Sequence, residues 1–199
     1  MYVGFIGAGA ISQAIATRLV ASDVEKITLS NSRGPASLSG VVRRLGGSTE
    51  AGTAQQAAEA DLTILSVPSS RVPAALAQVP DWTGRILVDT NNPIEAPTFV
   101  PVDLGSQTSS EVVAELAPGA RVVKGLNHLA PPIIAADPHD GGGRRVAFYS
   151  GDDQRAKKTF AALLHRLGFE GIDLGPLATG GALHQFPGGP LPSRNLVQY

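Results

Sequence analysis

The chain opens with a short apolar run that leads directly into two closely spaced glycines. Tyr2–Ile6 precedes Gly7 and Gly9, and apolar residues then recur at helical spacing from Ile11 to Leu19. This order predicts a buried strand, a tight turn and an amphipathic helix. Such a unit is typical of sheets whose parallel strands are covered by helices. The opening therefore favours an α/β fold.

Short β-rich runs and helical patterns alternate along the rest of the chain. The predicted strands are Lys26–Ser30, Ser48–Thr53, Leu62–Val67, Arg85–Asp89, Ala120–Leu126, Arg145–Ser150 and Ile172–Leu174. The predicted helices are Pro35–Leu45, Ser70–Gln78, Asp152–Leu167 and one that opens at the capping box of Thr108 and ends at Leu116. We expect residues 93–107 and Asn127–Gly143 to be loops. The fold class is a Rossmann-type, doubly wound, mostly parallel sheet with helices on both faces.

Charge and cysteine content exclude several functions. The chain has sixteen basic and seventeen acidic residues, which gives a net charge of −1. Such a chain has no overall positive field that would attract nucleic acid or an anionic membrane. No cysteine is present, which excludes a disulfide framework and is compatible with a reducing compartment. No basic residue precedes the apolar stretch at the N-terminus, and no apolar run approaches about 18 residues, so we expect a soluble, unprocessed, cytoplasmic protein.

The first turn has the spacing of a dinucleotide-binding turn. Gly7 permits the tight bend, and Gly9 lacks a side chain that would block a pyrophosphate at the N-terminus of the helix. The following residues, Ala10 and Ile11, open that helix, and Ala8 lies between the glycines. Ser12 stands where Gly or Ala is usual, and its hydroxyl is a further candidate for a phosphate contact.

The end of the second predicted strand indicates which dinucleotide is bound. An acidic side chain is expected about twenty residues after the glycines when the ribose carries a free 2′-hydroxyl. No Asp or Glu occurs from Ile27 to Thr49, whereas Asn31, Ser32 and Arg33 stand at the expected place. A guanidinium beside hydroxyl and amide donors suits a 2′-phosphate. We therefore predict NADP(H) as the cofactor, with a solvated polar turn as the alternative.

Residues that follow the later strands are expected to line the same crevice, because ligands of such sheets bind outside the carboxyl ends of the strands. They form three segments, 67–70, 91–93 and 127–131. Of the four histidines, only His128 lies in them, so it is the candidate pocket-lining residue or proton donor. The Asp137–Asp140 segment lacks a second element to complete a metal shell, and we expect no metal.

An ordered set of motifs spans nearly the whole chain. It comprises Gly7–Ser12, Asn31–Pro35, Ser66–Pro68, Asp89–Pro93, Lys124–His128, Gly151–Asp153 and Gly180–Pro190. On these residues the chain resembles the compact NADPH-dependent reductases of coenzyme F420, a 5-deazaflavin. The resemblance implies a homodimer and direct hydride transfer between the two cofactors, with the protein supplying proximity and orientation.

The resemblance also assigns roles to individual residues. Ala8–Ile11 would hold the pyrophosphate, and Ser32 and Arg33 the 2′-phosphate. The cofactor-binding set is Gly7, Ala8, Gly9, Ala10, Ile11, Ser12, Asn31, Ser32, Arg33, Ser66, Val67, Pro68, Arg71, Asn91 and Ala130, and the substrate-binding set is Asn127, His128, Leu129 and Pro131. Val67 and Arg71 would contact the middle of the cofactor, and Ala130 and Pro131 its nicotinamide end.

We expect one main domain followed by a short tail. Residues 1–174 are expected to form the NADP-binding domain with a C-terminal βαβ extension, and the irregular tail 175–199 to pack on the crevice or on a dimer partner. The tail is shorter than the helical domains of hydroxyacid dehydrogenases and pyrroline carboxylate reductases, and no membrane helices like those of metalloreductases are present. The second reactant could be F420 or a small C=O or C=N compound. The other alternative is a non-catalytic NADP-sensing module.

Overall fold

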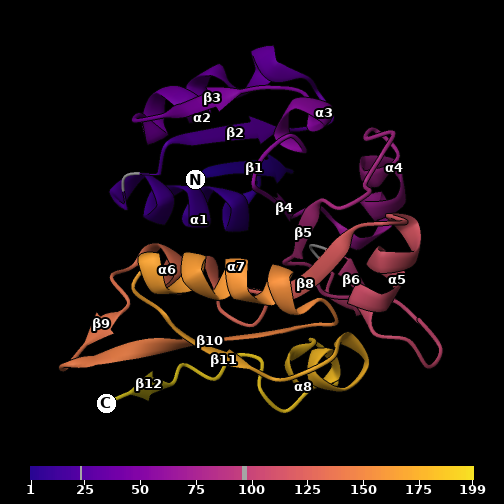
Figure 1. Ribbon diagram of the computed structural model, residues 1–199, viewed down its shortest axis with the longest axis vertical. Helices are drawn as coiled ribbons and strands as arrows, with labels where there is room; N and C mark the ends of the chain where they lie inside the picture. Colours follow the sequence, from indigo (N-terminus) through magenta and orange to yellow (C-terminus); the bar gives the residue numbers. More distant parts are fainter. Residues whose placement is uncertain (23, 96–97) are drawn as a thin grey trace.

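The computed structural model describes residues 1–22, 24–95 and 98–199. Its main sheet has the strand order β11-β10-β8-β5-β4-β1-β2-β3 (Figure 1). These strands are β1 (Tyr2–Ile6), β2 (Lys26–Ser30), β3 (Thr49–Ala51), β4 (Leu62–Leu65), β5 (Ile86–Asp89), β8 (Arg121–Gly125), β10 (Gly143–Gly151) and β11 (Glu170–Asp173). All neighbours pair in parallel except β10, which runs antiparallel to β8. The predicted mostly parallel Rossmann-type sheet is thereby confirmed.

Helices cover both faces of this sheet because its strands bury side chains on both sides. One face carries α1 (Ala10–Ala21), α6 (Pro131–Ala135) and α7 (Gln154–Arg166), with α1 packed against α6. The other face carries α3 (Ala54–Ala57), α4 (Val72–Leu76) and α5 (Ser109–Leu116). Alternate residues of a strand enter the two cores: Ile64 faces the α1 side, whereas Leu65 faces the α4 side.

Several predicted helices are confirmed, with changes at their starts. The helix expected from Pro35 begins as the 3₁₀ helix η1 (Pro35–Leu38) and continues as α2 (Ser39–Leu45). The helix expected from Ser70 likewise begins as η2 (Ser69–Arg71) before α4, since Pro73 lies in the first turn of α4. Thr108 caps α5 in the predicted capping box, and its hydroxyl accepts a hydrogen bond from the Glu111 N–H.

Short elements occur where the sequence predicts loops or nothing regular. Within 93–107 the strands β6 (Ile94–Glu95) and β7 (Val100–Pro101) form a small antiparallel pair, and residues 96–97 of that predicted loop lie outside the described residues. The predicted 127–143 connection contains α6 and the strand β9 (His139–Asp140). Two-residue strands and one-turn helices are too short for a periodic signal, so the loop predictions were wrong at these places.

The C-terminal segment packs along the second face of the sheet. It contains the π-helical turn η3 (Leu177–Gly181), α8 (Ala182–His184) and the strand β12 (Val197–Gln198), which pairs with β10. Leu177 and His184 are buried. In Figure 1 this yellow segment runs beneath β10 and β11 toward the chain end. No helix of the described residues is long and apolar enough to cross a membrane.

Candidate functional site

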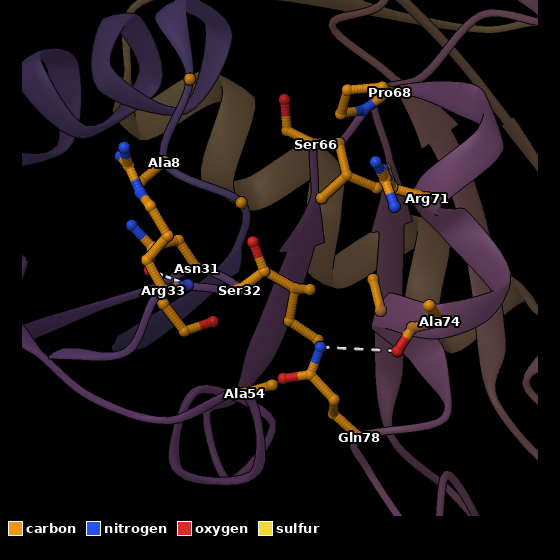
Figure 2. A pocket seen from close by; sticks show the side chains of 16 residues that line it. Ala8, Asn31, Ser32, Arg33, Ala54, Ser66, Pro68, Arg71, Ala74 and Gln78 are labelled. Atoms are coloured by element: carbon orange, nitrogen blue, oxygen red, sulfur yellow. Dashed lines mark hydrogen bonds between the residues drawn. The ribbon is translucent and has the colours of Figure 1, made fainter. Parts of the chain in front are cut away.

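A cavity of about 590 Å³ lies at the carboxyl ends of β1, β2 and β4 (Figure 2). It is lined by Ile6, Gly7, Ala8, Gly9, Ser30, Asn31, Ser32, Arg33, Ala54, Ser66, Val67, Pro68, Arg71, Ala74, Ala75 and Gln78. The turns after three strands meet here, which is the position where an open α/β sheet binds ligands. None of these lining residues is acidic.

The two glycines of the first turn leave the end of α1 open. Gly7 has a φ of +105°, and a Cβ there would lie 1.9 Å from the Ser66 carbonyl oxygen. A Cβ on Gly9 would meet no atom within 4 Å. The twelve-residue α1 begins directly after Gly9 and has no acidic side chain in its first turn. Its free N–H groups and dipole therefore favour an anion in the cavity.

Two arginines supply positive charge from different walls. Arg33 follows β2, and Figure 2 shows it on the side of the cavity opposite Arg71 of η2. The Asn31 side chain shapes the first turn, since its Oδ1 accepts from the Arg33 backbone N–H at 2.9 Å and its Nδ2 donates to Ser37 Oγ at 3.0 Å. The Arg33 side chain makes none of these turn contacts and lines the cavity.

Most predicted cofactor residues line this cavity, but five of them do not. Those outside the lining are Ala10, Ile11, Ser12, Asn91 and Ala130. Ala10 and Ile11 belong to the first turn of α1. Ser12 is buried, and its hydroxyl has no hydrogen-bond partner among the described residues. Asn91 lies behind the lining, where its Oδ1 accepts from the Val67 N–H at 3.0 Å.

Sequence reasoning missed six of the lining residues. The missed residues are Ile6, Ser30, Ala54, Ala74, Ala75 and Gln78. Three of them follow Arg71 at spacings of three, four and seven residues, so helical periodicity could have found them. The three alanines add small apolar side chains to the lining.

A buried polar row crosses the neighbouring strands on the α5 side of the sheet. Lys124 of β8 is paired in register with Asp89 of β5 and Ser150 of β10. Its ammonium is fully buried, lies 3.5 Å from Asp89 Oδ2, and donates to the Asn91 carbonyl at 2.9 Å and to Ser109 Oγ at 3.0 Å. Burial lowers the pKa of Lys124, and the Asp89 carboxylate opposes that shift.

The tail is tied to this row and to two turns after strands. His184 Nε2 lies 3.0 Å from Ser150 Oγ, and the His184 carbonyl accepts from Asn127 Nδ2 at 2.6 Å. Asn92 Oδ1 accepts from Asn127 Nδ2 at 3.0 Å and from the Phe186 N–H at 2.9 Å. Burial, and secondarily the charge of Lys124, lower the pKa of His184 to about 2.

The predicted substrate residues lie away from the cavity. Asn127, His128 and Leu129 are buried, and Ala130 is exposed. The His128 ring packs 5.1 Å from the Phe148 ring, and neither ring nitrogen has a described partner in good hydrogen-bonding geometry. Burial lowers the pKa of His128 to about 4, and the Val146 backbone opposes the shift. The expected role of this histidine stays a prediction.

Two other features of the sequence are placed elsewhere. Pro131 lines a separate shallow groove together with Gln13 and Thr17 of α1. The described residues hold no group of three or more His, Asp or Glu arranged for a metal ion. In the Asp137–Asp140 segment, Asp137 Oδ1 accepts from the His139 N–H at 3.0 Å.

The fold and the cavity are those of the Rossmann class of dinucleotide-binding proteins. Comparison with known families is more particular: residues 2–93 match the family described as coenzyme F420-dependent NADP oxidoreductases. Over this part the chain resembles that family, as its sequence predicts.

Similar structures and a curated relative extend the comparison to the whole chain. A hypothetical protein from Sinorhizobium meliloti is 46% identical, with a TM-score of 0.92 over 100% of this chain and 96% of that one. A candidate F420-dependent NADP reductase from an Arthrobacter species is 25% identical, with a TM-score of 0.71 over 88% and 85%. The rat (Rattus norvegicus) metalloreductase STEAP3 is 29% identical over 96% of this chain, which spans 37% of that protein's length.

Proposed function

We propose that this protein is an NADP(H)-dependent oxidoreductase that transfers a hydride between the nicotinamide and a second small planar reactant. The observation that carries the proposal is the first cavity, where the open end of α1 meets Arg33 and Arg71 with no acidic lining residue. The family match over residues 2–93 supports it.

The lining residues fit the chemical parts of NADP. The N–H groups that follow Gly9 at the start of α1 suit the pyrophosphate, because they are unpaired donors at a positive helix end. Ser32 and Arg33 suit the 2′-phosphate, for which a guanidinium gives charge-assisted contacts. Ala54, Ala74 and Ala75 give the lining small apolar side chains, which suit contact with a heteroaromatic ring.

A reduced nicotinamide, when bound, supplies the hydride. The residues of the chain then have to hold the cofactor, keep its ring in a dry slot and place the acceptor next to it. No covalent intermediate on a side chain is required. The acceptor we propose is F420 or a small C=O or C=N compound, and the expected homodimer and cytoplasmic location stay predictions.

One observation favours the alternative, a protein that binds NADP(H) without turnover. His128 and Leu129, which the family resemblance places against the second reactant, are each 3% exposed. A sensor needs no slot beside them. Turnover therefore has to be tested separately from binding.

The test is a calorimetric titration with NADPH and NADH, followed by oxidation of NADPH at 340 nm in the presence of F420. Tight NADPH binding and F420-dependent oxidation are expected. Tight binding without oxidation by F420 or by small carbonyl and imine acceptors would leave the sensor. Failure to bind either dinucleotide would contradict the proposal.

The cofactor preference gives a first mutational prediction. Arg33→Ala should weaken NADPH binding by about 1–3 kcal/mol and leave NADH binding nearly unchanged, because a charged partner of the 2′-phosphate is lost. Calorimetry measures both affinities. Arg155→Ala is the matched control, since Arg155 is an exposed residue of α7 that does not line the cavity. Equal losses for both dinucleotides at Arg33 would show that it does not bind the phosphate.

A further inference from the structure

The proposed phosphate contacts leave one end of the cavity unused. Figure 2 shows Ala54, Ala74 and Gln78 at the end of the cavity away from Ala8, and all three belong to its lining. The alanines have no polar side-chain atom. Gln78 is exposed, so its side-chain amide is open to a ligand at this end.

The end of α4 sets the orientation of this amide. The Gln78 backbone N–H donates to the Ala75 carbonyl at 3.4 Å and does not serve the Ala74 carbonyl, four residues back. Gln78 Nε2 donates to the Ala74 carbonyl instead, also at 3.4 Å (Figure 2). An amide turned by 180° would place Gln78 Oε1 against that carbonyl oxygen, where two acceptors repel each other. Oε1 therefore faces away from the Ala74 carbonyl.

In this orientation Gln78 offers a ligand one acceptor and one donor. Its Nε2 carries two protons, and the Ala74 carbonyl uses one of them. The second proton lies next to Oε1, which accepts from no described residue. Such a pair matches a ligand edge on which a donor stands beside an acceptor. The 6-amino group of adenine and its neighbouring ring nitrogen form an edge of this kind.

The covalent structure of NADP brings its base to this end of the cavity. This step rests on the proposed function, in which α1 binds the pyrophosphate and Ser32 and Arg33 bind the 2′-phosphate. The base is bonded to the ribose carbon next to the one that carries this phosphate, so it lies within one sugar ring of Arg33. The part of the lining left for it contains Ala54, Ala74 and Gln78. The small alanine side chains leave room for a flat ring there.

We propose that Gln78 selects adenine over purines without a 6-amino group, because its Oε1 accepts a hydrogen bond from that group. A purine with hydrogen at position 6 leaves Oε1 without this donor. A 6-oxo purine places a second acceptor against it. Gln78 is thus a specificity-determining residue for the base, whereas Arg33 is the one proposed for the phosphate.

The test compares two nucleotides that differ only at position 6 of the base. They are adenosine 2′-monophosphate and purine riboside 2′-monophosphate, which has hydrogen in place of the amino group. Neither contains a pyrophosphate or a nicotinamide, so the difference in their affinities reports on the base alone. In calorimetric titrations of the full chain, we expect the adenosine nucleotide to bind about fivefold more tightly, the usual effect of one hydrogen bond.

Three variants separate the acceptor oxygen from the rest of the side chain. Gln78→Met keeps the length of the side chain but removes the amide, so the two nucleotides should then bind within about twofold of each other. Gln78→Glu keeps an acceptor oxygen and should retain the preference, although its charge weakens the binding of both phosphates. Gln154→Met is the matched control, because Gln154 is an exposed residue of α7 outside the lining, and it should leave both affinities unchanged.

Two results would overturn the role of Gln78. They are equal binding of the two nucleotides by the unaltered protein, and a full preference for the adenosine nucleotide in folded Gln78→Met. The first comparison needs no variant to fold. NADPH titrated into the same protein keeps the two proposals apart: if NADPH binds and the nucleotides bind equally, only the role of Gln78 fails, whereas no binding of NADPH or of either nucleotide overturns the proposed function as well.

Discussion

Gly7 and Gly9 lie two residues apart, yet a side chain would have different consequences at the two positions. At Gly7 the backbone has a φ of +105° and a side chain would collide with the Ser66 carbonyl. Gly7→Ala should therefore lower the free energy of unfolding by at least about 2 kcal/mol. Urea unfolding measures this loss.

Gly9→Ala is the matched variant of this pair. Its Cβ would enter open space, so the loss of stability should not exceed about 1 kcal/mol, the usual cost of Ala at a helix N-cap. NADPH affinity should nevertheless fall, because the methyl group occupies the space in front of α1. Unchanged NADPH affinity in this variant would argue against a pyrophosphate at that position.

Single residues were predictable where local spacing carries the information. The glycine turn and Arg33 were found from their distance to a strand end, and the structure brings them to one cavity. Asn91 was assigned to the same site only because it follows a strand. Its side chain instead accepts from the Val67 N–H and does not line the cavity, and this placement depends on rotamers and packing that the sequence does not display.

At the scale of elements, the least predictable feature is the buried row of Asp89, Lys124 and Ser150. Each residue follows a run of apolar residues in its strand, so each could have been a solvated strand end. The row exists only because three strands far apart in sequence are neighbours in register. Pairing across β8 and β10 is antiparallel, and nothing local in either segment indicates that direction.

At the same scale, hydrogen bonds of the Asn92 side chain connect the tail to the turns that follow β5 and β8. This side chain accepts from Asn127 Nδ2 and the Phe186 N–H, and its own Nδ2 donates to the Asn127 carbonyl at 2.8 Å. Asn92→Ala should lower stability by about 1–3 kcal/mol. Hydrogen exchange should accelerate at Phe186 and its neighbours while β1 stays protected, because the loss is local.

The control for this prediction is Gln198→Ala, in the same tail. Gln198 is exposed and belongs to β12, where backbone pairing with β10 does not need its side chain. Exchange at Phe186 should be unchanged in this variant. Equal acceleration in both variants would mean that the tail loosens as a whole, independently of Asn92.

For the whole molecule, the architecture was predictable from the sequence because strands and helices along the chain carry the same kinds of start and stop residues. Buried strands such as Leu62–Leu65 are followed within three residues by Pro or Asn, and helices such as α5 and α7 start after capping residues. The path of the last 25 residues was less predictable, since glycine and proline leave many conformations open. Contacts with β10, α5 and the turns after β5 and β8 select one of them.

Two buried histidines make the stability of the whole molecule sensitive to acid. The folded protein keeps His128 and His184 neutral, with pKa values of about 4 and about 2, whereas an unfolded histidine takes up a proton near pH 6.5. Unfolding therefore binds protons below pH 6.5. The stabilisation is complete above that pH and declines as the pH falls toward the folded pKa values.

Each buried histidine should contribute a slope of up to about 1.4 kcal/mol per pH unit, or about 2 kcal/mol between pH 6.5 and 5. His128→Phe should remove one such contribution while keeping the ring packed against Phe148, because neither His128 nitrogen has a described partner in good geometry. Urea unfolding from pH 7.5 to 5 measures the slope, and His165→Gln, at an exposed position of α7, should leave it unchanged. A slope in His128→Phe as steep as in the unaltered protein would mean that His128 takes up a proton as readily in the folded protein as in the unfolded one, so that burial does not lower its pKa.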